Sequence, residues 1–155
     1  MNVYLFVKTL HILSATLLVG TGFGTAFYLF WANRSGSLQA QAVVSHWVVK
    51  ADWWFTTPAV VFQFCSGLWM MSELHWPWGA AWIWGTLALF VFVGICWLPV
   101  VWLQVRMAKL AAAARDEGGE MPSLYWRYAR IWEFLGYPAF CATVVIYFLM
   151  VMKPV

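Results

Sequence analysis

Four long apolar runs occupy most of this sequence, and short polar segments separate them. The runs predict helices over about residues 3–32, 52–73, 79–114 and 123–152. Each is long enough to cross a bilayer, which takes about 20 mostly apolar residues. With 64% hydrophobic and only 10% charged residues, the chain cannot cover a water-facing surface with polar side chains. We therefore expect an all-α integral membrane protein, a single domain over residues 1–155 folded as a four-helix up-down bundle in the lipid bilayer.

The same composition excludes several classes of function. A soluble enzyme does not fit so apolar a chain, and the nine Lys and Arg residues form no basic stripe on a water-facing domain. We therefore expect no nucleic-acid partner. The sequence also lacks the HExxH, CxxCH, GxGxxG and phosphate-loop motifs that mark common metal, haem and nucleotide sites.

Between the first two runs, segment 35–50 has the apolar residues Val43, Val44, Trp47 and Val48 among polar neighbours. This pattern is typical of a short helix that lies in the membrane interface.

Local signals place the other boundaries. Residues 116–122 form the one clearly hydrophilic loop, and Ser123 is suited to cap the helix that follows. Pro99 and Pro138 fall inside apolar runs, where they predict bends in the third and fourth helices.

The basic residues predict how the chain is oriented. Two lie on one side of the predicted membrane (Lys8 and Lys153) and seven on the other (Arg34, Lys50, Arg106, Lys109, Arg115, Arg127 and Arg130). Because loops rich in Lys and Arg stay in the cytoplasm, we expect both termini on the outer side of a bacterial-type inner membrane. We interpret the tryptophans near the run ends as interfacial anchors (Trp53, Trp54, Trp76, Trp78, Trp82 and Trp126).

Ionisable residues inside a span are functional candidates, because a polar group in hydrocarbon costs several kcal/mol unless it is paired. His11 lies about two turns into the first helix and Lys8 one turn nearer its start. The face of His11 carries residues that leave room for a flat group or a close helix: Ala15, Leu18, Gly22, Thr25 and Ala26. The Gly20/Gly24 pair, on the opposite face, is typical of a helix-packing groove.

Two interpretations of His11 remain open from the residues alone. Its imidazole is either a haem ligand held in a helix bundle or a hydrogen-bonding partner of another helix. Lys8 either extends to the interface or pairs with an anionic group such as a haem propionate.

Four further polar residues, Glu133, Gln63, His75 and His46, are candidates for structural or site roles. Glu133 is either paired structurally, for example with Arg130, or contacts protons or substrate. Gln63 is most simply a hydrogen-bonding link between helices. A second histidine ligand would more readily be His75 than His46, because His75 shares a membrane side with His11.

Several segments resemble the HemJ-type protoporphyrinogen oxidases and, more closely, a related family of small integral membrane proteins with no assigned function. They are VKTLHI (7–12), TPAV (57–60), SGLW (66–69), AWI (81–83), LAL (87–89), GYP (136–138) and VMKP (151–154). The resemblance implies a four-helix bundle that binds haem b through His11. HemJ-type enzymes also use a lysine early in helix three, where this chain has Gly85 or Thr86, so the resemblance does not carry over porphyrinogen oxidation.

We therefore expect a membrane haem-b protein in electron transfer, with a quinone or a tetrapyrrole as partner. His11 would bind iron, and Lys8, Gly22 and Glu133 would line the cofactor site. The alternatives are a non-haem scaffold or accessory subunit of a larger complex, and a small carrier or channel. A homo-oligomer is compatible with each of these.

Overall fold

The computed structural model describes residues 2–77 and 79–154, which are helical apart from short connections and contain no strand. Trp78, one of the expected interfacial anchors, lies outside these residues. The elements are α1 (Val3–Arg34), α2 (Leu38–Ala51), the π-helix η1 (Asp52–Thr56), α3 (Thr57–Glu73), α4 (Ala81–Glu117) and α5 (Ser123–Met152).

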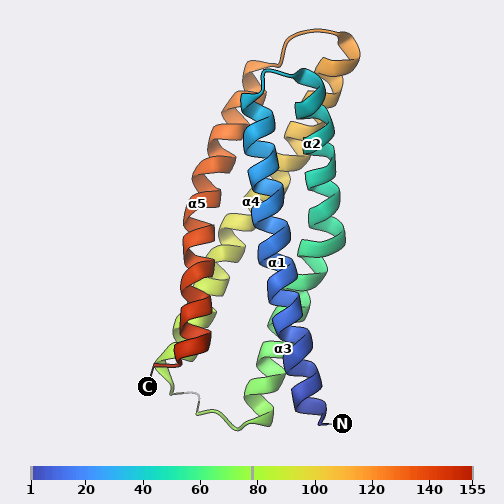
Figure 1. The fold of residues 1–155 in the computed structure, drawn as a ribbon. Coiled ribbons are helices and arrows are strands. Elements are labelled where there is room, and N and C mark those ends of the chain that lie inside the picture. The colour runs from blue at the N-terminus through green and yellow to red at the C-terminus, as the bar shows by residue number, and fades with distance from the viewer. Residues whose placement is uncertain (1, 78, 155) are drawn as a thin grey trace.

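The helices form a four-helix bundle, as expected. Each of its four rods runs from one end of the bundle toward the other and is here called a crossing. Three of the helices, α1, α4 and α5, are each long and apolar enough to span a membrane. The other crossing is the continuous rod of α2, η1 and α3 (Figure 1). Both chain ends lie at one end of the bundle, here named the terminal end, and the α1–α2 and α4–α5 connections lie at the other, the loop end (Figure 1).

The π-helix lets the second crossing continue through a proline. Pro58 has no N–H and its ring would collide with the carbonyl four residues earlier in an α-helix. The structure widens the turn before it, so that the Thr57 N–H donates to the Asp52 carbonyl five residues back. The Thr57 hydroxyl donates to the same carbonyl at 2.9 Å. The rod therefore keeps its direction, and Asp52 faces inward with only 4% of its surface exposed.

The expectation of an interfacial helix over 35–50 is corrected by the structure. α2 stands upright and packs along α1 and α4 instead of lying flat (Figure 1). Its buried residues are Gln41, Ala42, Ser45 and Val48, whereas Val43 and Trp47 are 39% and 61% exposed. Small side chains let α2 approach its neighbours closely, and the Ser45 hydroxyl is paired with the Gln41 carbonyl at 2.6 Å.

The end of α4 and the start of α5 follow turn chemistry. Gly118 adopts a left-handed conformation (φ 64°), and the Gly119 N–H donates to the Ala114 carbonyl at 3.1 Å, which closes α4 in a Schellman motif. Ser123 is not the cap that the sequence predicts, because Pro122 occupies that position and Ser123 is the first helical residue.

The loop-end half holds the packed core, and its buried members come from α1, α2, α4 and α5. They are Leu29, Ala42, Val48, Val100, Leu103, Met107, Ala111, Tyr125, Ala129 and Trp132.

Two features mark the same level in the bundle. The apolar run of α4 ends at Arg106, two residues after Gln104, and Gln104 pairs with Asp52 at the start of η1. From η1 to the end of α3 the second crossing has 22 residues, a length of about 33 Å at 1.5 Å per residue, which matches the hydrocarbon thickness. Beyond that level the bundle extends past the apolar spans and carries most of the basic residues.

Two further expectations concern the prolines inside the helices and the Gly20/Gly24 pair. Pro99 and Pro138 lie inside α4 and α5, which continue through them as helices. A Cβ added at Gly20 or Gly24 would meet no atom within 4 Å, so the residues that the structure describes leave this groove unfilled.

Candidate functional site

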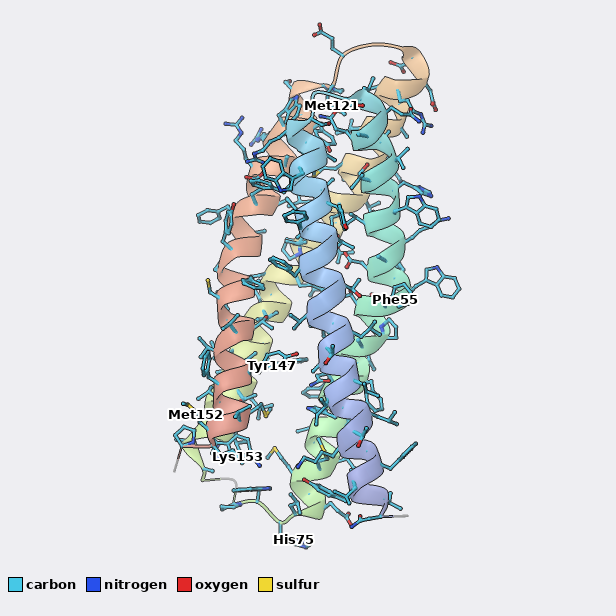
Figure 2. The ribbon with its side chains drawn as sticks, in the orientation of Figure 1. Phe55, His75, Met121, Tyr147, Met152 and Lys153 are labelled. Carbon is cyan, nitrogen blue, oxygen red and sulfur yellow. The ribbon has the colours of Figure 1, made fainter. Side chains whose placement is uncertain are left out.

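A cavity of about 560 Å³ lies between the helix pair α1/α3 and the pair α4/α5, in the terminal half of the bundle. All four crossings contribute to its wall, which is mainly apolar: Ile12, Phe64, Leu68, Ile83, Leu87, Phe90 and Ile146 are among its residues. Tyr147 and Lys153, labelled in Figure 2, lie on its α5 side. Its volume falls in the range of about 300–1,000 Å³ that is typical of ligand pockets.

His11 is the central polar group of this wall, and α3 holds its ring at both nitrogens. His11 Nδ1 lies 2.7 Å from Ser66 Oγ, and His11 Nε2 lies 2.8 Å from Gln63 Nε2. Gln63 and Ser66 are three residues apart, so they share one face of α3. The ring is also close to the backbone, because a Cβ at Gly67 would lie 3.5 Å from His11 Cε1.

These contacts favour one tautomer of a neutral imidazole. The Ser66 hydroxyl donates its single proton to the Phe62 carbonyl. Ser66 Oγ is then left to accept a hydrogen bond, which favours the His11 tautomer with its proton on Nδ1. His11 Nε2 is then an acceptor and takes an N–H from the Gln63 amide. The only lone pair that the ring offers is on Nε2, beside the cavity.

Two polar atoms in the same wall have no partner. Gln63 Oε1 and Thr86 Oγ1 are buried and form no hydrogen bond within the part of the chain that the structure describes. Both residues line the cavity, from α3 and α4 respectively. Buried polar atoms are nearly always paired with protein, water or a ligand. The unpaired oxygens are therefore places where a bound polar group would gain a hydrogen bond.

Two lysines lie at the terminal end of the cavity, on different crossings. Lys8 comes from α1 and Lys153 follows the last turn of α5. Lys153 Nζ lies 5.0 Å from the centre of the Trp76 ring and 5.8 Å from that of Trp82. Neither lysine forms an ion pair with any residue of 2–77 or 79–154. The cavity thus combines an apolar body, one imidazole and a cationic mouth.

The structure brings together two of the four predicted site residues. His11 and Lys8 line the cavity, whereas Gly22 and Glu133 do not. Glu133 is paired, as one interpretation expected, but its partner is Arg34 and not Arg130. Arg34 Nη1 is 3.0 Å from Glu133 Oε1, and Glu133 is 22% exposed in its side chain. This ion pair lies where α1 ends, toward the loop end of the bundle and away from the cavity.

The other histidines do not reach His11. His46 is exposed on α2, toward the opposite end of the molecule, and His75 is exposed in the α3–α4 connection, where Nδ1 lies 3.2 Å from the Glu73 carbonyl. Neither lines the cavity. Within residues 2–77 and 79–154 no group of three His, Cys, Asp or Glu side chains is arranged to hold a metal ion.

Sequence reasoning missed Ser66, Thr86 and Lys153 as cavity residues, although it anticipated Gln63 as a link between helices. The second crossing gives one usable signal in its spacing. Ala59, Gln63 and Ser66 recur at intervals of four and three residues in α3, and Asp52 and Thr56 of η1 precede them at intervals of four and three. Asp52 was missed as well, because it lies at the start of an apolar run. Thr56 Oγ1 donates to Asp52 Oδ1 at 2.8 Å. In the amide orientation that satisfies both neighbours, Gln104 donates an N–H to Asp52 Oδ2 (2.5 Å) and accepts from Trp132 Nε1 (3.3 Å).

Fold and site together define the class: an all-α polytopic membrane protein with an intramembrane cavity around one histidine. The chain matches the family described as "Predicted integral membrane protein (DUF2269)" over residues 5–154, and it belongs to that family. No curated protein and no solved structure matches it. The family assignment agrees with the expected small membrane protein.

Proposed function

We propose that this protein binds haem b in the cavity, with His11 Nε2 as an iron ligand, and carries electrons within the membrane. The observation that carries the proposal is the state of His11. Its Nδ1–H is directed at Ser66, and its one acceptor lone pair, on Nε2, lies beside a cavity of ligand size and is now used by Gln63. A histidine that binds a metal typically donates its other ring N–H to a neighbouring acceptor in this way.

The remaining wall fits the same group. The apolar residues would surround the porphyrin body, and the two lysines of the mouth would face its carboxylates. His11 must exchange its Gln63 hydrogen bond for the iron, and the Gln63 side chain has rotatable bonds to do so. Bound haem would supply one-electron chemistry by cycling between ferric and ferrous iron. The resemblance to HemJ-type proteins around His11 supports haem as the flat group.

The partner in electron transfer would be a quinone or another tetrapyrrole within the bilayer. The outer surface of the bundle supports a membrane-soluble partner, since large apolar side chains such as Phe134, Tyr137 and Val151 are exposed there.

A second candidate function is a non-haem membrane scaffold or accessory subunit. The observation that favours it is that both ring nitrogens of His11 are already hydrogen-bonded to α3. In that case His11 only fastens α1 to α3, together with the 3.2 Å hydrogen bond from Ser14 Oγ to the Ala59 carbonyl. The two candidate functions differ in one measurable property, which is whether the purified protein binds haem.

The test is a haem titration of the purified protein in detergent. We expect a saturable Soret band at one haem per chain, with a shift on reduction, and a red preparation when the protein is expressed with haem available. The cavity and single histidine predict this stoichiometry. A colourless protein that binds no added haem, and that copurifies with a larger complex, would overturn the proposal in favour of the scaffold.

We also propose a bacterial-type inner membrane with both termini outside. Support comes from seven of the nine basic residues, which belong to the parts of the sequence near the α1–α2 and α4–α5 connections. These connections lie at the loop end, opposite the termini (Figure 1). Asn2→Cys and Glu120→Cys form a matched pair, because both residues are exposed and lie at opposite ends. In a variant without the three native cysteines, Asn2→Cys should react with an impermeant reagent in intact spheroplasts, and Glu120→Cys only after lysis. The reverse pattern would invert the orientation.

A further inference from the structure

We infer that Lys8 and Lys153 form a two-point anion site that makes the cavity selective for a ligand with two carboxylates along one edge. This inference rests on the proposed function, and it adds which feature of the ligand the protein selects. Lys153 is the less expected of the two residues, because a lysine at the end of the last apolar run does not by itself suggest a binding site.

Lys153 is held toward the cavity by its surroundings. It ends α5 in a left-handed conformation (φ 44°), which turns the chain at the residue that caps the helix. The ammonium then lies over two aromatic rings, Trp76 and Trp82, whose centroids are 5.3 Å apart in an edge-on arrangement. An ammonium over such rings gains stabilisation without being neutralised, so its charge remains available to an anion.

Lys8 faces the same mouth from the other helix pair. It lies one turn before His11 on α1, so its Cα is about 4.5 Å closer to the terminal end along the helix axis. One lysine therefore comes from the α1/α3 pair and the other from the α4/α5 pair, and the cavity separates them. Since the described residues place no carboxylate on either ammonium, two positive charges are left for the ligand to match.

The two lysines would discriminate between ligands that have the same apolar part but different charge. A neutral amphiphile would gain only the apolar burial that the wall supplies. A dianion would gain one partner at each lysine and would also be oriented, because its charged edge must lie at the mouth. Charge complementarity of this kind contributes more to specificity than to raw affinity.

Haem and haem dimethyl ester are the matched probes, since they share iron and ring and differ in the two carboxylates. We expect the wild-type protein to bind haem about tenfold more tightly than the ester at low salt, from two partly exposed ion pairs. The preference should shrink as ionic strength rises, because salt screens such pairs. Lys153→Met should reduce the preference to about threefold, with ester affinity unchanged, and Lys153→Arg should restore it.

Lys50→Met is the control, because Lys50 also lies 5.0 Å from a tryptophan ring, Trp47, but outside this cavity. It should leave the preference unchanged. Equal binding of haem and ester to the wild type would overturn the anion site while leaving haem binding intact. Equal loss of both ligands in Lys153→Met would assign Lys153 to structure alone. If the wild type binds neither form, the proposed function fails and this inference fails with it.

Discussion

If His11 binds iron as proposed, replacing it by alanine should lower haem affinity by at least about 100-fold and remove the wild-type Soret band, because the iron would lose its protein ligand. His11→Gln is the matched variant, since a glutamine side chain can keep hydrogen bonds toward Ser66 or Gln63 but is a poor iron ligand. Optical titration in detergent measures both effects, and thermal unfolding of the haem-free proteins shows whether the bundle still folds. Added imidazole should restore part of the band in the alanine variant by filling the vacated space.

The two candidate functions give different results for this pair. If His11 only fastens α1 to α3, His11→Gln keeps the stability and any pigment of the wild type. Gln63→Leu adds an independent measurement. It removes the hydrogen bond to His11 Nε2, which leaves this nitrogen without a partner only when no ligand is bound to it. The haem-free variant should therefore be less stable by about 1–3 kcal/mol, whereas the loaded variant should not. A wild-type spectrum and haem stoichiometry in His11→Ala would reject iron ligation by His11.

Gln104→Met should be the most damaging conservative change outside the cavity. Asp52 is 4% exposed, and its carboxylate is held only by the Thr56 hydroxyl and the Gln104 amide among the groups the structure describes near it. Methionine fills a similar volume but leaves the Asp52 oxygen and the Trp132 N–H unpaired. A buried polar atom left without its hydrogen-bond partner costs about 1–3 kcal/mol, and the unpaired indole N–H adds to it. We expect the midpoint of thermal unfolding to fall by about 6–12 °C.

Gln39→Met provides the control, because Gln39 is exposed on α2, and its midpoint should stay within about 2 °C of the wild type. The double variant Asp52→Leu with Gln104→Met should lose less stability than the two single variants together, since removing the buried carboxyl also removes the need for its partner. An unchanged midpoint in Gln104→Met, measured by loss of monodisperse protein on heating, would show that Asp52 does not depend on this amide.

The sequence by itself determined the membrane class, the four crossings and the shared side of the two termini. These properties follow from the length of the apolar runs and the distribution of charge, because each segment enters the bilayer according to its own hydrophobicity and flanking charges. It also singled out His11 and Lys8, because an ionisable residue within a span is rare enough to stand out. It could not orient α2, because apolar residues lie on more than one face of this helix and do not indicate which face packs against the bundle. Val43 and Trp47 are exposed, whereas Val48 is buried together with the small residues Ala42 and Ser45.

Only the tertiary structure decided which polar residues meet. The partners of His11 are 52 and 55 residues away, Arg34 and Glu133 are 99 apart, and Lys8 and Lys153 belong to different helix pairs. Such pairs depend on how each helix is rotated and how far it slides against its neighbours. Those quantities are set by packing across the whole bundle, including the π-helix that carries the second crossing past Pro58. No local pattern encodes them. For that reason the sequence grouped Glu133 with His11, although Glu133 does not line the cavity, and it did not bring Ser66, Thr86 and Lys153 together with His11.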